Sequence, residues 1–108
     1  MATNNKILGR LKPTAVTPTT LYTVPGATQA NVNLFCANQS ASADDIIRVA
    51  ITPSGSTLAV TDYIVFDITI KKGTSENLTG IALAAGDFIT VQSTNGTVSF
   101  VATGIEVS

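Results

Sequence analysis

Short apolar runs alternate with turn-forming residues along most of the chain. After residue 19, seven runs are rich in Val, Ile, Thr, Phe and Tyr, the residues that favour β-strands. Pro25-Gly26, Lys72-Gly73 and Asn95-Gly96 are among the turns between them, and Asn-Gly favours a two-residue hairpin because a type I′ turn needs positive φ at both central residues. The predicted strands are Thr20–Val24, Ala30–Asn38, Asp45–Thr52, Tyr63–Lys71, Asn77–Leu83, Phe88–Ser93 and Val98–Val107.

A period of two within these runs predicts which side chains face the core, because successive residues of a strand point to opposite faces. Between residues 63 and 71, every second residue is a large apolar one: Ile64, Phe66, Ile68 and Ile70. We expect this set to be buried and the other set, which includes Tyr63 and Val65, to face outward. The inner faces of the other runs are predicted to hold Val32, Leu34, Cys36, Ile47, Val49, Ile51, Ile89 and Val91.

Seven short strands without a long amphipathic helix predict an all-β fold. An antiparallel β-sandwich accommodates such a series, with residues 20–108 as the domain. Immunoglobulin-like and jelly-roll-like sandwiches both fit, because the spacing of strands does not reveal their order. Residues 56–62 are the one segment that we expect to form a short helical turn.

Residues 1–19 differ from the rest of the chain. They are polar, contain Gly9, Pro13 and Pro18, and show neither a strand period nor a helix period, which predicts an extended N-terminal arm. The basic residues Lys6, Arg10 and Lys12 all precede the first acidic residue, Asp44. An arm that docks on an acidic partner surface would explain this charge distribution, and a solvated tail is the alternative.

The composition favours a protein that is part of a larger assembly. Of the 108 residues, 44% are hydrophobic and 12% are charged, whereas about a quarter of the residues of ordinary soluble domains are charged. A net charge of −1 provides no field that would attract nucleic acid or an anionic membrane. We also find no secretion signal in residues 1–20 and no apolar stretch of membrane-spanning length, so we expect synthesis in a cytoplasm and no membrane partner.

Catalytic chemistry has little support in the sequence. The chain contains no histidine, which removes the commonest general base and the commonest zinc ligand. Cys36, the single cysteine, alternates with Val32 and Leu34 and is expected to be a buried thiol. Asp44-Asp45 is a weak candidate for a calcium ligand pair, and loop solubility is the preferred interpretation. We therefore expect neither enzymatic activity nor a cofactor or metal.

Apolar residues on the faces predicted to be outward are the candidates for an interface. They are Phe35, Ile46, Tyr63 and Val65. A patch of such residues on neighbouring strands marks a contact surface, although cover by the N-terminal arm would also explain them. Together with Lys6, Arg10 and Lys12, these four residues form the predicted interface set.

Several segments resemble a group of small structural proteins of tailed bacteriophages. They are Leu21–Gly26, Asn31–Asn38, Ile47–Thr52, Asp62–Asp67, Leu78–Asp87 and Ile89–Ser93. The resemblance covers roughly residues 20–105 and implies a β-sandwich on the virion, as a capsid decoration, a head fibre, or a tail and baseplate accessory. It implies no catalytic residues.

The leading hypothesis is a capsid decoration or cement protein. It would be made in the host bacterial cytoplasm and bind the major capsid protein as a homo-oligomer, for which we expect a trimer. A tail, baseplate or fibre accessory protein bound to other tail proteins is the second hypothesis. The third is a module that binds host glycans, with Tyr63 or Phe35 as a platform on which a sugar stacks.

Overall fold

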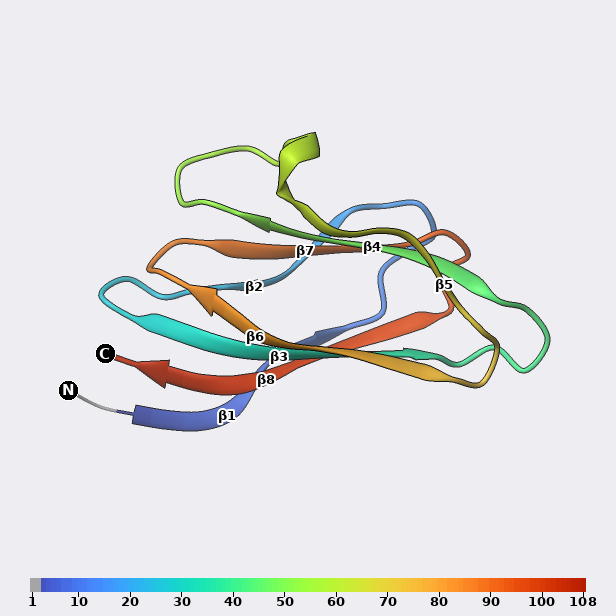
Figure 1. Cartoon of the computed structure of the whole chain (residues 1–108), viewed down its shortest axis with the longest axis horizontal. Helices are drawn as coiled ribbons and strands as arrows, with labels where there is room; N and C mark the ends of the chain where they lie inside the picture. The colour runs from blue at the N-terminus through green and yellow to red at the C-terminus, as the bar shows by residue number, and fades with distance from the viewer. Residues whose placement is uncertain (1–2) are drawn as a thin grey trace.

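The computed structural model describes residues 3–108 and shows two four-stranded antiparallel sheets packed face to face (Figure 1). The all-β sandwich predicted from the sequence is therefore confirmed. The prediction for residues 1 and 2, as part of an arm, lies outside the described residues. The strands are β1 (Thr3–Leu11), β2 (Thr19–Thr23), β3 (Gln29–Asn38), β4 (Asp45–Thr52), β5 (Tyr63–Ile70), β6 (Ser75–Leu83), β7 (Phe88–Ser93) and β8 (Val98–Val107), and a 3-10 turn, η1 (Val60–Asp62), precedes β5.

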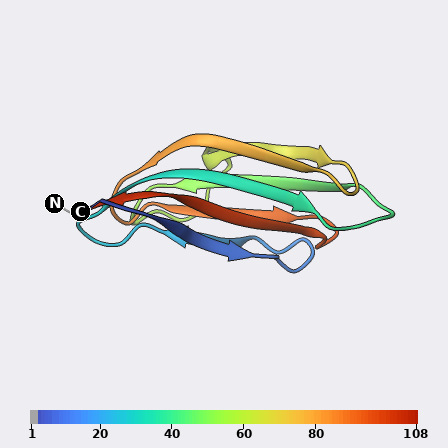
Figure 2. The same cartoon turned by 90° about the horizontal axis from the view of Figure 1, so that it is seen from below.

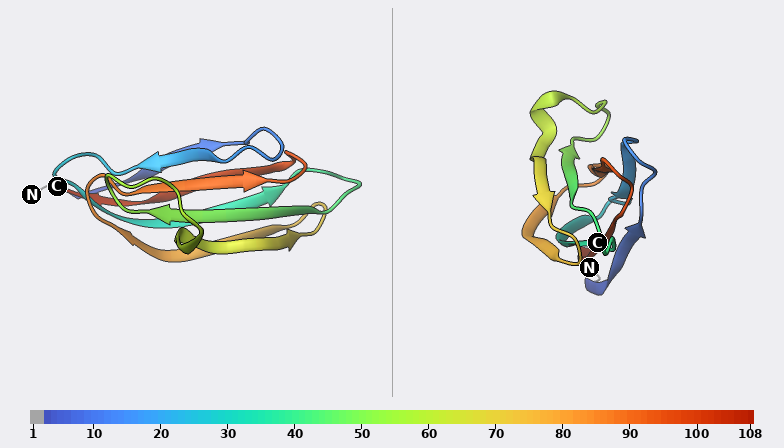
Figure 3. Two further views of the ribbon diagram at one scale, coloured as in Figure 1. Left: turned by 90° about the horizontal axis from the view of Figure 1, so that it is seen from above. Right: turned by 90° about the vertical axis from the view of Figure 1, so that its right-hand side faces the viewer.

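The strand order identifies the type of sandwich. Sheet A has the order β1-β8-β3-β6 and sheet B has the order β2-β7-β4-β5; Figures 2 and 3 show the molecule from the two opposite sides. Among the described strands, β4 and β5 alone are consecutive neighbours in one sheet, and every other connection crosses between the sheets. This order is that of a jelly roll, so the jelly roll is the one of the two predicted sandwich types that the structure adopts.

Residues 3–11 form an edge strand rather than part of an extended arm. β1 pairs with β8 along its length, which corrects the expected division into an arm of residues 1–19 and a sandwich of residues 20–108. The sandwich has eight strands, and β1 is the strand that the sequence pattern missed.

A bulge explains why β1 shows no period of two. The register with β8 shifts between Ile7 and Gly9, so Leu8 and Leu11, which are three residues apart, both pack against the core. The same bulge brings β1 close to β2. A Cβ atom at Gly9 would lie 2.4 Å from the carbonyl oxygen of Leu21, so this approach requires glycine.

The core fills the space between the sheets. Phe100 of β8 is its largest fully buried side chain, and each buried aliphatic side chain contributes roughly 1.5–3 kcal/mol relative to an exposed one. Most of the predicted core is confirmed. The predicted residues that are buried are Val32, Leu34, Cys36, Ile47, Val49, Ile70, Ile89 and Val91, whereas Ile51 is half-buried.

The predicted faces of β5 are wrong at Ile64, Val65 and Phe66. Phe66 is 51% exposed and Ile64 is 47% exposed, whereas Val65 packs against the core. Tyr63 faces outward beside Phe66, as predicted, and is half-buried. Ile68, also predicted to be buried, is 49% exposed at the open edge of the sheet.

The cause of this reversal is a bulge in β5. Ile47 of β4 lies opposite Ile68, but the next residue, Arg48, lies opposite Phe66. Asp67 is therefore the extra residue, and its φ of 57° is left-handed. A single inserted residue exchanges the two faces of a strand beyond it, which turns Phe66 outward.

A buried carboxylate ties β4 to the β7–β8 hairpin. Asp45 accepts hydrogen bonds from the backbone nitrogens of Asn95 and Thr97, from the Thr97 hydroxyl and from the Ser93 hydroxyl. Burial opposes ionisation of Asp45, but these hydrogen bonds together outweigh burial and hold its pKa below the ordinary value. Asp45 is thus a structural residue, and the calcium ligand pair considered from the sequence has its second carboxylate fully engaged by the protein.

We expect Asp45→Ala to destabilise the domain by about 2–4 kcal/mol, because several buried donors lose their acceptor. Asp44→Ala is the matched control. Asp44 is exposed and its carboxylate accepts one hydrogen bond, from the Lys72 nitrogen, so loss of this side chain should cost about 1 kcal/mol or less. Urea denaturation of both variants measures the difference, and equal losses would contradict the structural role of Asp45.

Candidate functional site

The outer face of sheet B carries a cluster of aromatic, charged and aliphatic side chains near its β5 edge. Figure 3 shows β4 and β5 side by side at this edge. We name this surface the β5 patch and define it as Ile46, Arg48, Tyr63, Ile64, Phe66 and Asp67. Ile46 and Arg48 point outward from β4, because Asp45, Ile47 and Val49 between and beside them are buried.

Arg48 is at the centre of the β5 patch. Its guanidinium carbon lies 4.1 Å from the centroid of the Phe66 ring, close enough for a cation–π interaction. Its Nε donates to Asp67 Oδ1 at 2.6 Å and its Nη2 donates to Oδ2 at 3.2 Å. This bidentate pair fixes the guanidinium over the ring.

Tyr63 packs against the Phe66 ring in the β5 patch. The ring centroids of Tyr63 and Phe66 are 5.2 Å apart and the rings are inclined by 76°, an edge-to-face arrangement that is favourable for aromatic pairs.

The hydrogen bond from Arg48 keeps the pKa of Asp67 below its ordinary value. Asp67 is therefore ionised at neutral pH, and the β5 patch carries one positive and one negative charge.

The bulge that forms this surface places the backbone of Asp67 in a strained conformation. A non-glycine residue in the left-handed region costs about 1 kcal/mol or more, although Asp tolerates this region better than most residues. Such residues are concentrated at functional sites. The strain here has an identifiable result, since the bulge presents Phe66 to solvent and brings Asp67 to Arg48.

The structure divides the predicted interface residues among several places. Ile46 and Tyr63 lie in the β5 patch. Val65, in contrast, packs against the core, so its prediction as an outward residue is wrong. Lys12 is exposed just after β1.

Phe35 and Arg10 share the outer face of sheet A. Phe35 is 45% exposed and lies opposite Val101 of β8 and Asn77 of β6. Arg10 of β1 lies opposite Val101 on its other side. Arg10, Val101, Phe35 and Asn77 therefore form one row across the sheet, in which Arg10 is the charged member.

Lys6 is engaged within the molecule. Its Nζ lies 2.8 Å from Glu106 Oε1, and the Tyr22 hydroxyl donates to Glu106 Oε2. This network joins β1, β8 and β2 across one end of the sandwich. Lys6 and then Tyr22 lower the pKa of Glu106, whereas burial and then the hydrogen bond to Glu106 raise the pKa of Tyr22.

The apolar pattern of the sequence did not indicate that Arg48, Ile64, Phe66 and Asp67 belong to an exposed site. The apolar alternation of residues 64–70 is equally regular with and without a bulge, so it assigned Ile64 and Phe66 to the core. One signal was present, because Asp67 interrupts an apolar strand and Asp is one of the few residues that adopt the left-handed conformation of a bulge.

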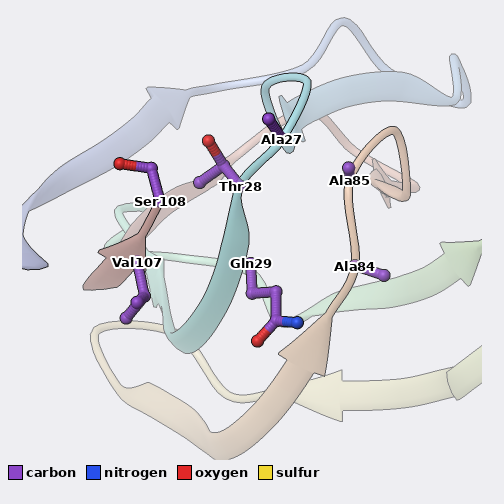
Figure 4. A pocket seen from close by; sticks show the side chains of 7 residues that line it. All are labelled: Ala27, Thr28, Gln29, Ala84, Ala85, Val107 and Ser108. Atoms are coloured by element: carbon purple, nitrogen blue, oxygen red, sulfur yellow. The ribbon is translucent and has the colours of Figure 1, made fainter. Parts of the chain in front are cut away.

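The clefts of the molecule are lined mainly by side chains that do not act as general acids or bases. One cleft, of about 480 Å³, is lined by Ala27, Thr28, Gln29, Ala84, Ala85, Val107 and Ser108 (Figure 4). None of these side chains is titratable, so they provide no general acid or base. An adjoining groove of about 340 Å³ has a lining of the same kind.

A third cleft, of about 140 Å³, lies at the open edge between β5 and β6 and includes Cys36 and Glu76. Burial, and to a smaller extent the charge of Glu76, raises the pKa of the Cys36 thiol to about 12. The thiol therefore stays protonated and is a poor nucleophile. Within residues 3–108, no three side chains of the metal-ligating types come together in a way that could hold an ion, and no helix has the length and apolarity needed to cross a membrane.

Comparison with known proteins adds one structural likeness. No protein-family model matches the chain, and no curated protein matches it in sequence. Its fold is similar to part of a chain from the crystal structure of the T13 IBDV viral particle, with a TM-score of 0.55 and 9% sequence identity. The match covers 97% of this chain and 30% of that chain, so this protein corresponds to less than a third of the length of its neighbour, and the likeness concerns the fold.

The Lys6–Glu106–Tyr22 network predicts a contribution to acid sensitivity. A carboxylate with a lowered pKa stabilises the fold above its ordinary pKa of 4.5 and loses that contribution as the pH falls through the folded-state value. Glu106→Gln should therefore lower the melting temperature at pH 7 and flatten its decline between about pH 5 and pH 3. Some decline should remain, because Asp45 also has a lowered pKa.

Thermal melts of the wild type and the variant over this range measure the effect. Glu76→Gln, which removes an exposed carboxylate from β6, controls for the change in net charge. Parallel declines in the wild type and Glu106→Gln would show that the network does not contribute to acid sensitivity.

Proposed function

We propose that this protein is a virion structural protein of a tailed bacteriophage that decorates or cements the capsid as a homo-oligomer. The observation that carries the proposal is the jelly-roll sandwich of this chain, whose fold is similar over nearly its whole length to part of a chain of a viral particle. Jelly rolls also occur in lectins and cupins, and a fold by itself does not define a function. The surface and the composition supply the remaining support.

Three features favour an assembly role. Charged residues are few, and several of them pair within the molecule, as Lys6 does with Glu106 and Arg48 does with Asp67. Both sheets expose large apolar side chains on their outer faces. A domain with these properties gains stability when its surfaces are buried against other subunits.

The proposal includes the absence of catalytic activity. The chain has no histidine, its cysteine is a protonated thiol, and the cleft of about 480 Å³ is lined by side chains that do not titrate. In this proposal the protein acts by burying surface between subunits, as interfaces of about 800 Å² per partner do.

We assign particle binding to the outer face of sheet A. The extended arm of residues 1–19, which the sequence offered as an anchor, is replaced over residues 3–11 by strand β1. Arg10 of this strand stays exposed in the row that contains Phe35. A row with an apolar ring and an exposed cation suits an acidic site on the major capsid protein.

Two alternatives from the sequence remain open to the same experiment. A tail, baseplate or fibre protein would use the same surfaces at another place on the particle. Glycan binding is favoured by the exposed Phe35 ring, whereas Tyr63 is half-buried against Phe66 and offers less of its face.

Cosedimentation with capsids that lack this protein tests the proposal. The wild type should bind saturably, and Phe35→Asp and Arg10→Glu should each weaken binding at least tenfold, because each removes part of the row on sheet A. Lys72→Glu, an exposed change in the β5–β6 turn, is the matched charge control and should bind as the wild type does.

Gold labelling of intact particles accompanies the binding assay. Label on the tail, with no binding to capsids, would replace decoration with the tail function. No label and no binding, together with retention on a glycan array that Phe35→Ala abolishes, would replace it with glycan recognition.

A further inference from the structure

We propose that the β5 patch is the surface through which copies of this chain contact one another. The inference deepens the proposed function, on which it rests for the expectation of a homo-oligomer, by naming the contact between subunits. It also assigns the outer face of sheet A to a different partner. Four observations about the β5 patch carry the argument.

The first observation is the bulge at Asp67. Without an inserted residue, the alternation that buries Ile70 would also bury Phe66 and turn Val65 outward. The protein instead adopts a left-handed aspartate and exposes about half of a phenylalanine. The core exchanges the larger side chain of Phe66 for the smaller one of Val65, so a partner that covers Phe66 would recover the apolar burial that the bulge gives up.

The second observation is that the four edge strands differ in how well they are protected against pairing with other chains. Natural sandwiches protect their edges with charge, bulges, proline or short strands. β1 carries Lys6 and Arg10 and a bulge, β6 carries Glu76 and a bulge, and β2 has five residues with prolines on either side. β5 has bulges too, but its exposed side chains are mainly apolar and its one charge is already paired.

The bulges determine the kind of contact that this edge can make. Two register shifts between β4 and β5 twist the free edge away from a regular ladder, which disfavours the addition of a foreign strand. The contact must therefore be made by side chains. Apolar side chains of β4 and β5 surround Arg48 in the β5 patch, and the partly exposed polar residue Gln92 follows beside Arg48 on β7, as at the polar rim of an interface.

The third observation concerns charge and identifies the partner as a second copy. The β5 patch holds one cation and one anion, and both remain partly exposed. In any closed symmetric oligomer, Arg48 of one copy can approach Asp67 of the next, and the same contact is repeated around the axis. Two of the five guanidinium donors are used within the chain, which leaves donors for that contact.

The fourth observation is that sheet A lacks this self-complementarity. The row around Phe35 contains Arg10 and no acidic residue. Two copies that met through this row would bring like charges together, which costs free energy. The two apolar surfaces thus suit different partners, with a copy of the chain on the β5 patch and an acidic surface on sheet A.

Measurement of the mass in solution tests the inference. By light scattering after gel filtration, the wild type should be an oligomer, Phe66→Asp should be a monomer at the same concentration, and its dissociation constant should rise at least a hundredfold. Phe35→Asp introduces the same change at a similarly exposed phenylalanine of sheet A and should keep the wild-type mass. A monomeric wild type, or a Phe66→Asp variant with the wild-type mass, would overturn the inference, as would dissociation caused by Phe35→Asp alone.

Hydrogen exchange supplies a second readout that does not depend on a variant. On dilution of the wild type below its dissociation constant, amides of β5 should exchange faster while those of β1 keep their rates. Faster exchange in β1 with unchanged β5 would place the contact elsewhere.

These outcomes separate the inference from the proposed function. A monomer that still binds capsids would overturn the β5 patch and the homo-oligomer and leave capsid binding in place. An oligomer that dissociates on Phe66→Asp but never labels the virion would overturn the virion function and leave the β5 patch in place.

Discussion

Burial of one face of every strand between two sheets is the interaction on which the rest of this structure depends. The core is aliphatic apart from Phe100, Tyr22 and Cys36, and it is shared by strands that are mostly distant in sequence. A domain of this size has little apolar area to spare. The apolar side chains that the fold leaves outside are therefore informative about partners, and they lie on the outer faces of both sheets.

The charged residues that are paired within the molecule have two different structural roles. Asp45 and Glu106 are buried carboxylates whose partners fix strand ends and close the sandwich. Arg48 and Asp67, in contrast, are paired on the surface, where solvent screening leaves an ion pair with little effect on stability. The first pair of residues holds the fold together, whereas the second is too weakly stabilising to explain a strained backbone by itself.

Much of the fold was predictable from the sequence, because alternation and turn chemistry act locally. The boundaries of β4 and β7 agree with their predicted runs, and the cores of β3, β4 and β7 follow from the period of two. The strand order was not predictable, because it depends on which distant edges pair. β1 and the outward face of β5 were missed for one shared reason: an inserted residue, at Leu8-Gly9 in one strand and at Asp67 in the other, changes the phase of the pattern without changing its composition.

The pairing of β1 with β8 has a consequence for how the protein is made. The first described strand has its partner in the last, with Thr3 opposite Val107, so sheet A cannot close until β8 has left the ribosome. Long-range pairing of this kind slows folding and leaves unpaired strands exposed for a time. A product truncated before β8 would lack the strand that joins β1 to β3, so sheet A could not be completed in it.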